Sequence, residues 1–126
     1  MNKEDYVSFE VAKLLKEKGN NSISDSFYDK KGKVAIMSPS AQQHMLKLGY
    51  LEDSYPRPTL YEAQKWLRDT MCLHIEISYM YGDYWLYDIL TIPTHDLIGL
   101  SDRENVKYIS YEEALNAGIL EALKLI

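Results

Sequence analysis

The sequence predicts an α+β fold in which a small antiparallel sheet, centred on a hairpin at 73–92, packs against three main helices. Three capped, amphipathic segments at 8–18, 59–71 and 110–125 predict the helices. Between the second and third of them the hydrophobic period changes from 3.6 residues to two, which indicates a pair of strands. A chain of this length is large enough to bury a hydrophobic core without help from disulfides or structural metal ions, so we expect a single domain over residues 1–126.

The first half of the chain is expected to hold a helix and a short hairpin. Ser8 is a suitable N-cap for the helix, and the sequence GNN at 19–21 is a typical stop. Strands are expected at 23–28 and 33–37, joined by the turn DKKG at 29–32, in which glycine suits the left-handed position.

The second helix has the clearest start in the chain. A short helix capped by Ser40 and an irregular connection over 50–57 are expected before it. Pro58 disfavours helical backbone in the residue that precedes it. Thr59 and Glu62 are spaced as a capping box, which satisfies two backbone N–H groups. Apolar residues then recur at steps of three and four, so one face of this helix is expected to be buried.

The hairpin at 73–92 is expected to form the centre of the sheet. Its first strand alternates apolar and polar residues, as a strand with one covered face requires. Its second strand, 84–92, is apolar or aromatic on both faces, so we expect it to be central or doubly covered. A two-residue turn would place Ile77 opposite Asp88, whereas a three-residue turn would pair Ile77 with Tyr87, and both registers stay open.

The last quarter of the chain is expected to contain a loop, a short strand and a closing helix. The loop at 93–105 is near the upper length of an ordinary connection. A strand at 106–109 is expected to precede a helix that Ser110 caps. Gly118 lies inside this helix at a cost of about 1 kcal/mol relative to Ala, which suggests close packing or a local break.

The three cap residues Ser8, Thr59 and Ser110 lie at equal intervals of 51 residues. Each is followed four positions later by alanine, at Ala12, Ala63 and Ala114. A duplicated αββ unit with a terminal helix would explain this spacing. Convergent use of the same capping residues is the alternative, because the two hairpins share little beyond their form.

Charge and composition limit the classes of function. Fourteen Lys and Arg against nineteen Asp and Glu give a net charge of −5, so nucleic acid is an unlikely partner. The single cysteine excludes an internal disulfide framework. The first residues are polar, and no apolar run approaches the roughly 18 residues that span a bilayer. We therefore expect a cytoplasmic protein with no membrane association and no cofactor.

Two groups of residues are candidate functional sites. Cys72, His74 and Glu76 would share a strand face if the strand begins early enough, and their side chains are possible zinc ligands; the alternative is a half-exposed polar face. His74 and Glu76 have the spacing of the H-x-E motif of zinc deaminases, but the pair of cysteine ligands that such a site also needs is missing from the sequence. Eleven tyrosines are present, and five aromatic residues near the hairpin tip suit either a protein interface or the core and rim of the sheet. They are Tyr79, Tyr81, Tyr84, Trp85 and Tyr87.

The segment PRPTLYEAQKWLRD at 56–69 and the closing segment SYEEALNAGILEALKLI at 110–126 resemble a family of short uncharacterised proteins of bacterial genomes and their phages or prophages. That family has a Pro-Thr cap, an Ala and a Trp-Leu-Arg before a strand, and a Tyr-Glu-Glu-Ala helix at the end. The matching residues here are Pro58, Thr59, Ala63, Trp66, Leu67, Arg68, Tyr111, Glu112, Glu113 and Ala114. The family often has Ala where this chain has Arg57. The resemblance implies an accessory protein of a mobile element, and it carries over no activity or catalytic residue to this chain.

The sequence as a whole favours a non-enzymatic interaction protein. It would associate with itself or bind a protein partner through the aromatic surface of the sheet. One alternative is a small metal-assisted enzyme that uses Cys72, His74 and Glu76. Another is a single-strand nucleic-acid binder that stacks bases on the tyrosine cluster.

Overall fold

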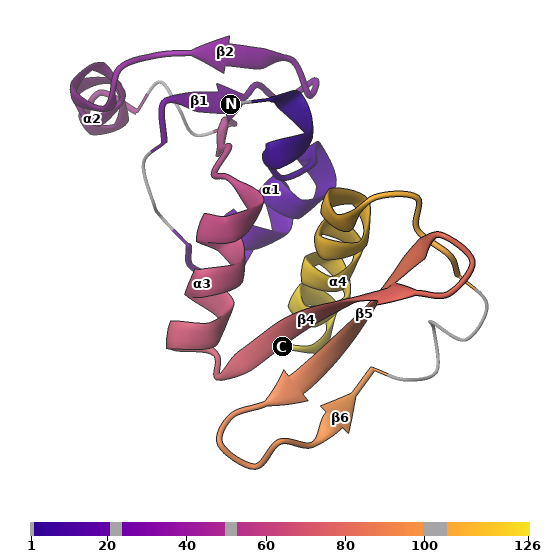
Figure 1. Cartoon of the computed structure of the whole chain (residues 1–126). Helices are drawn as coiled ribbons and strands as arrows, with labels where there is room; N and C mark the ends of the chain where they lie inside the picture. Colours follow the sequence, from indigo (N-terminus) through magenta and orange to yellow (C-terminus); the bar gives the residue numbers. More distant parts are fainter. Residues whose placement is uncertain (1, 21–23, 50–52, 100–105) are drawn as a thin grey trace.

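The computed structural model describes residues 2–20, 24–49, 53–99 and 106–126. Helices α1, α3 and α4 lie between two three-stranded antiparallel sheets, and α2 lies apart at one end of the first sheet (Figure 1). The predicted α+β fold is therefore confirmed. The element bounds in chain order are η1 (Lys3–Asp5), α1 (Phe9–Glu17), β1 (Ser26–Tyr28), β2 (Val34–Ile36), α2 (Pro39–Lys47), β3 (Tyr55–Pro56), α3 (Leu60–Thr70), β4 (Leu73–Met80), β5 (Tyr84–Thr91), β6 (Leu97–Ile98) and α4 (Tyr111–Leu125).

The first sheet has the strand order β2-β1-β3. Its third strand, β3, falls in the stretch 50–57 where an irregular connection was predicted, and that prediction is wrong for the residues that pair with β1. Helix α2 begins earlier than predicted, because Ser38 rather than Ser40 is its cap and accepts the N–H of Ala41 at 3.3 Å. Proline at the first helical position is compatible with this start, since its missing N–H has no partner there in any helix.

The second sheet has the order β4-β5-β6, so β5 is central, as predicted. Ile77 pairs with Tyr87 and Met80 with Tyr84, which is the register of the three-residue turn. Positive φ angles at Gly82 and Asp83, of 102° and 62°, produce that turn. The extra strand β6 lies inside the predicted loop 93–105. It pairs with Ile89 and Leu90 of β5 and so covers that part of the edge of β5.

Four predicted features are only partly within the described residues. Residues 21–23, which belong to the stop of α1 and the start of the predicted first strand, lie outside them. The same holds for 50–52 and for 100–105 of the predicted loop. The predicted strand at 106–109 is reduced to one antiparallel bridge, between Tyr108 and Trp85.

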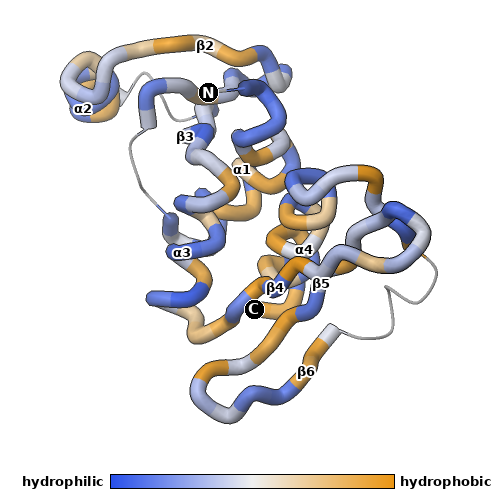
Figure 2. Tube along the Cα trace, viewed as in Figure 1, coloured by the Kyte–Doolittle hydropathy of each residue, from blue (hydrophilic) through white to orange (hydrophobic). Residues whose placement is uncertain are grey.

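Helix α4 packs on the base of the β4–β5 hairpin. A Cβ atom at Gly118 would lie 2.6 Å from Ile75 Cγ2 and 3.1 Å from Tyr87 Cγ, so close packing explains this glycine. Figure 2 shows hydrophobic residues along α4 and along the adjoining part of the second sheet. The buried Leu115, Ile119 and Leu123 of α4 belong to the same core as buried residues of α1 and α3.

Candidate functional site

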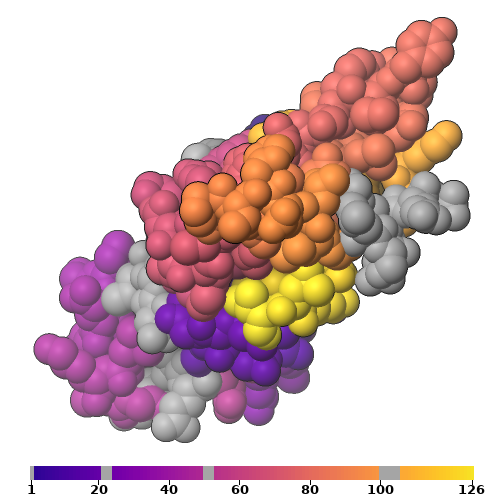
Figure 3. Space-filling view, turned by 90° about the horizontal axis from the view of Figure 1, so that it is seen from below, coloured from indigo at the N-terminus to yellow at the C-terminus, as the bar shows by residue number. Residues whose placement is uncertain are grey.

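The β4–β5 hairpin extends past α4 at its tip, where Figure 3 shows it standing clear of the helices. Tyr81 in the turn is fully exposed, and Tyr79 is 57% exposed. Tyr84 and Trp85 are half-buried, whereas Tyr87 is 4% exposed and belongs to the core. The aromatic cluster named from the sequence therefore divides into an exposed tip, a rim and one core residue.

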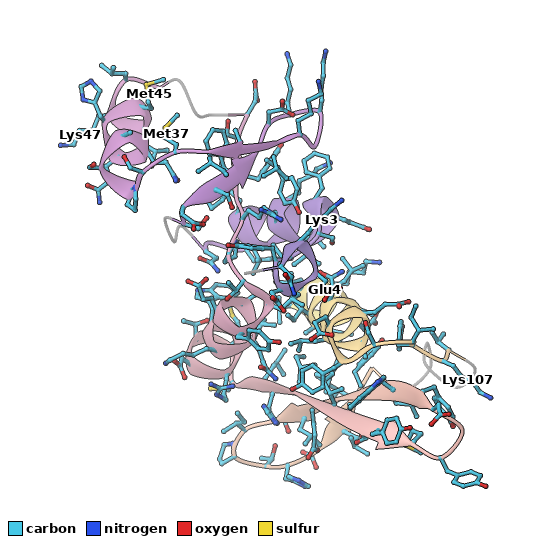
Figure 4. The ribbon with its side chains drawn as sticks, turned by 45° about the horizontal axis from the view of Figure 1, so that its top comes forward. Lys3, Glu4, Met37, Met45, Lys47 and Lys107 are labelled. Carbon is cyan, nitrogen blue, oxygen red and sulfur yellow. The ribbon has the colours of Figure 1, made fainter. Side chains whose placement is uncertain are left out.

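Ring contacts hold the rim of this cluster in place. The ring centroids of Tyr79 and Trp85 are 4.9 Å apart, and those of Trp85 and Tyr111 are 5.5 Å apart with an edge-to-face arrangement. Lys107 Nζ lies 4.9 Å from the ring centroid of Tyr84, and Figure 4 shows Lys107 beside the hairpin. Trp85 thus has a structural role that joins β5 to the start of α4.

Two phenols at this end of the molecule have perturbed acidity. The Tyr79 hydroxyl donates a hydrogen bond to the Asp83 carboxylate, which raises the pKa of Tyr79 because ionisation would break that bond. Burial raises the pKa of Tyr108, and the carboxylates of Glu113 and Glu121 add to the effect. Both side chains are therefore neutral hydrogen-bonding groups at neutral pH.

The outer edge of β4 presents backbone groups to solvent. In an antiparallel ladder, alternate residues direct their N–H and C=O groups to opposite sides of the strand. Gln64 of α3 donates its side-chain N–H to the Ile75 carbonyl at 2.8 Å, from the side away from β5. Ile77 and Tyr79 share the parity of Ile75 and direct their backbone groups the same way. Among the described residues, no other strand runs beside this edge.

Cys72, His74 and Glu76 do not form a metal site in this structure. Cys72 precedes β4 in a left-handed conformation, with φ of 55°, so it does not continue the alternation of the strand. His74 is half-buried, and its Nδ1 has no hydrogen-bond partner within the part of the chain that the structure describes. Glu76 is exposed. Nowhere in the described ranges do three His, Cys, Asp or Glu side chains gather in a way that could hold a metal ion.

A second cluster, around Arg57, was not among the sequence candidates. Arg57 is only 8% exposed, and its guanidinium carbon lies 4.0 Å from the ring centroid of Tyr6 and 5.7 Å from that of Tyr28. Its Nη1 donates to Ser26 Oγ at 3.4 Å, and no residue in the described ranges accepts a hydrogen bond from its buried Nε. An arginine in a polar stretch ordinarily indicates a solvated surface, so composition carries no signal for this burial.

Backbone contacts of the N-terminal segment enclose this arginine. Tyr6 forms an antiparallel bridge with Thr59, and the Val7 N–H donates to the Pro58 carbonyl at 3.1 Å. The buried Tyr28 hydroxyl donates to the Val7 carbonyl at 2.6 Å. Residues far apart in the chain therefore meet around one cationic side chain.

Comparisons with protein-family models, curated proteins and solved structures found no match for this chain. In the part of the chain that the structure describes, no helix is both long and apolar enough to cross a membrane. The resemblance to phage-associated proteins and the nucleic-acid alternative stay predictions. The functional argument therefore rests on the geometry of the molecule.

Proposed function

We propose that this protein is a non-enzymatic interaction protein that associates with a second copy of itself through the outer edge of β4 and the tyrosines beside it. The open backbone groups of Ile77 and Tyr79 carry the proposal, because an edge strand is a template for pairing with another strand. The proposal includes an accessory role in a mobile element. That role rests on the resemblance to phage-associated proteins alone and not on a mechanism.

The side chains of this edge favour pairing. Proteins usually protect an edge strand with charges, proline or a covering element. Here Gln64 covers the edge at Ile75, while the part towards the tip has no such cover among the described residues. The one charged residue of β4 is Glu76, and its side chain lies on the opposite face from those of Ile77 and Tyr79.

A symmetric pair of copies suits this edge. An antiparallel arrangement centred on Tyr79 pairs Ile77 of one copy with Tyr81 of the other, and sets Glu76 opposite Gly82 rather than another charge. The tip extends past α4, so the helices of the two copies stay apart (Figure 3). The contact is short, so we expect a weak dimer that forms in the micromolar range or above.

The test is the solution mass by light scattering over a wide concentration range. Tyr79→Pro removes the outward N–H but leaves the ladder to β5 intact, because proline is tolerated on the open side of an edge strand. Tyr79→Thr is the matched control, since it removes the same ring but keeps the N–H and a good strand propensity. We expect a concentration-dependent dimer for the wild type, no dimer for Tyr79→Pro and a weakened one for Tyr79→Thr.

Amide hydrogen exchange provides a second measurement on the same samples. The Ile77 and Tyr79 amides are expected to gain protection as the wild-type concentration rises. A wild type that stays monomeric throughout would refute self-association, and equal masses for the two Tyr79 variants would refute backbone pairing. Trp85→Ala is less suitable, because Trp85 packs on Tyr111 and its loss would disturb the fold.

A further inference from the structure

We propose that the cavity beside Arg57 binds a small organic monocarboxylate. The cavity has a volume of about 260 Å³. It lies on the other side of the helical layer from the β4 edge, and Figure 4 shows Lys3 on η1 between the first sheet and α4. Its lining residues are Lys3, Tyr6, Asp25, Ser26, Ile36 and Arg57.

The guanidinium of Arg57 has far more donors than acceptors around it. Arginine carries five N–H donors, and a buried charge is normally paired with a carboxylate or with several oxygens. Here the side chain has one long hydrogen bond, to Ser26 Oγ, and no ion pair with any described carboxylate. Its buried Nε has no acceptor among the described residues. This imbalance favours a ligand that supplies oxygen acceptors to the guanidinium.

The aromatic neighbours restrict the direction from which a ligand approaches. Tyr6 lies closest to the guanidinium, with its ring centroid 4.0 Å from the central carbon, as in stacking on the flat face. The N–H groups point outward in the plane of the guanidinium, so an acceptor must come to its edge. A planar carboxylate matches that edge with two parallel hydrogen bonds.

The charges in the cavity wall select a single negative charge. Lys3 and Arg57 are cationic, and Asp25 is anionic without forming an ion pair with either of them. The wall therefore carries a net charge of about +1, which suits a monocarboxylate better than a doubly charged phosphate. Ile36 lines the cavity and is 84% exposed, so a short hydrocarbon chain on the ligand would meet an apolar side chain near solvent.

The experiment is an NMR titration of the whole chain with sodium butyrate, with sodium chloride as the reference at equal ionic strength. We expect saturable shifts of the Arg57 side-chain N–H signals and of the Ser26 amide as the guanidinium gains acceptors. Inorganic phosphate is expected to bind more weakly. No saturable response to butyrate beyond that to chloride, or tighter binding of phosphate, would overturn the proposal.

Four variants separate the site from the fold. Arg57→Lys keeps the charge but loses the planar group that makes two parallel hydrogen bonds, so we expect butyrate to bind at least about tenfold more weakly. Arg68→Lys on α3 is the matched control and should bind butyrate as the wild type does. Because Arg57 is buried and its variant could unfold, Lys3→Gln tests the same cavity from the short surface helix η1 and should weaken binding. Asp25→Asn removes a repulsive charge and should strengthen it. If the Lys3→Gln and Asp25→Asn variants are both folded and both bind butyrate as the wild type does, the proposal is overturned.

Discussion

The chain contains two segments with the same order of elements, α1 followed by β1 and β2, and α3 followed by β4 and β5. Their helices begin alike: Ser8 Oγ accepts the Val11 N–H at 3.3 Å, and Thr59 Oγ1 accepts the Glu62 N–H at 3.1 Å. Their hairpins differ, with three-residue strands in the first and eight-residue strands in the second. Similar local signals have therefore produced unequal sheets.

Packing partners account for the difference. Helix α4 lies along both strands of the second hairpin, and α3 adds contacts to β4. The first hairpin has only β1 fully buried, and β2 is largely exposed. A long hairpin is stable where a helix covers its face, whereas a short one is stabilised mainly at its single buried strand. The 51-residue spacing of the caps fits both duplication and convergent capping, and duplication stays a hypothesis.

The largest expected losses of stability come from two glycines, one that packs on the second hairpin and one in the turn of the first. Gly118→Ala forces a methyl group against Ile75 and Tyr87, so we expect the free energy of unfolding to fall by about 1–3 kcal/mol despite the gain in helix propensity. Gly32→Ala, in the first hairpin turn, places Ala at φ of 86° beside the ring of Phe9. We expect a loss of about 1–2 kcal/mol there, because Ala is strained at this positive φ and the half-buried ring of Phe9 must shift slightly.

Denaturant unfolding of both glycine variants gives this comparison. Ala117→Gly, in the same helix as Gly118 but only partly buried, lowers helix propensity and removes one methyl group, and should cost at least about 1 kcal/mol. A Gly118→Ala variant as stable as the wild type would show that α4 and the second hairpin do not pack as closely as described.

The two matching caps should differ by a smaller amount. Thr59→Ala removes one cap and should cost about 1 kcal/mol. Ser8→Ala should cost about 0.5–1 kcal/mol more, because Ser8 Oγ also accepts from Asn116 Nδ2 at 3.2 Å, a bond that ties α1 to α4. Thermal or urea unfolding measures both. Equal losses for the two variants would mean that the bond to Asn116 adds nothing.

The smallest effects are expected in the pH dependence, where Asp29 and Tyr108 act at opposite ends of the scale. Backbone hydrogen bonding by Lys33 lowers the pKa of Asp29 in the first hairpin turn below 3.8. Its contribution to stability is therefore present above that pH and is lost as the pH falls through the folded pKa. Burial raises the pKa of Tyr108 above 10.0, so its contribution is present below pH 10.0 and is lost as the pH rises through the folded pKa.

Urea unfolding across the pH scale separates these two contributions. Asp29→Asn should flatten the acid side of the stability curve only, because the amide oxygen still accepts the same backbone N–H groups. Tyr108→Phe should flatten the alkaline side only. A change on the opposite side for either variant would contradict the assignment of the acid contribution to Asp29 and the alkaline contribution to Tyr108.

The parts of the fold that were predicted correctly depend on neighbours in the chain. The Thr59 and Glu62 capping box is present, and Ser110 Oγ accepts the Glu113 N–H as an N-cap. The central place of β5 follows from its apolar residues on both faces, which any sheet must cover. The exposed Tyr79 and Tyr81 were named from sequence as well, but their division from the buried Tyr87 was not.

The sequence by itself determined the starts of α1, α3 and α4, the α+β class and the position of the long hairpin, because caps and hydrophobic periods act over a few residues. Only the tertiary structure decided the hairpin register, the short strands β3 and β6, and the burial of Arg57 between Tyr6 and Tyr28. Each of these depends on residues that are distant in the chain. Packing and backbone hydrogen bonding across the molecule select their partners, and a local sequence pattern does not specify partners that are distant in the chain.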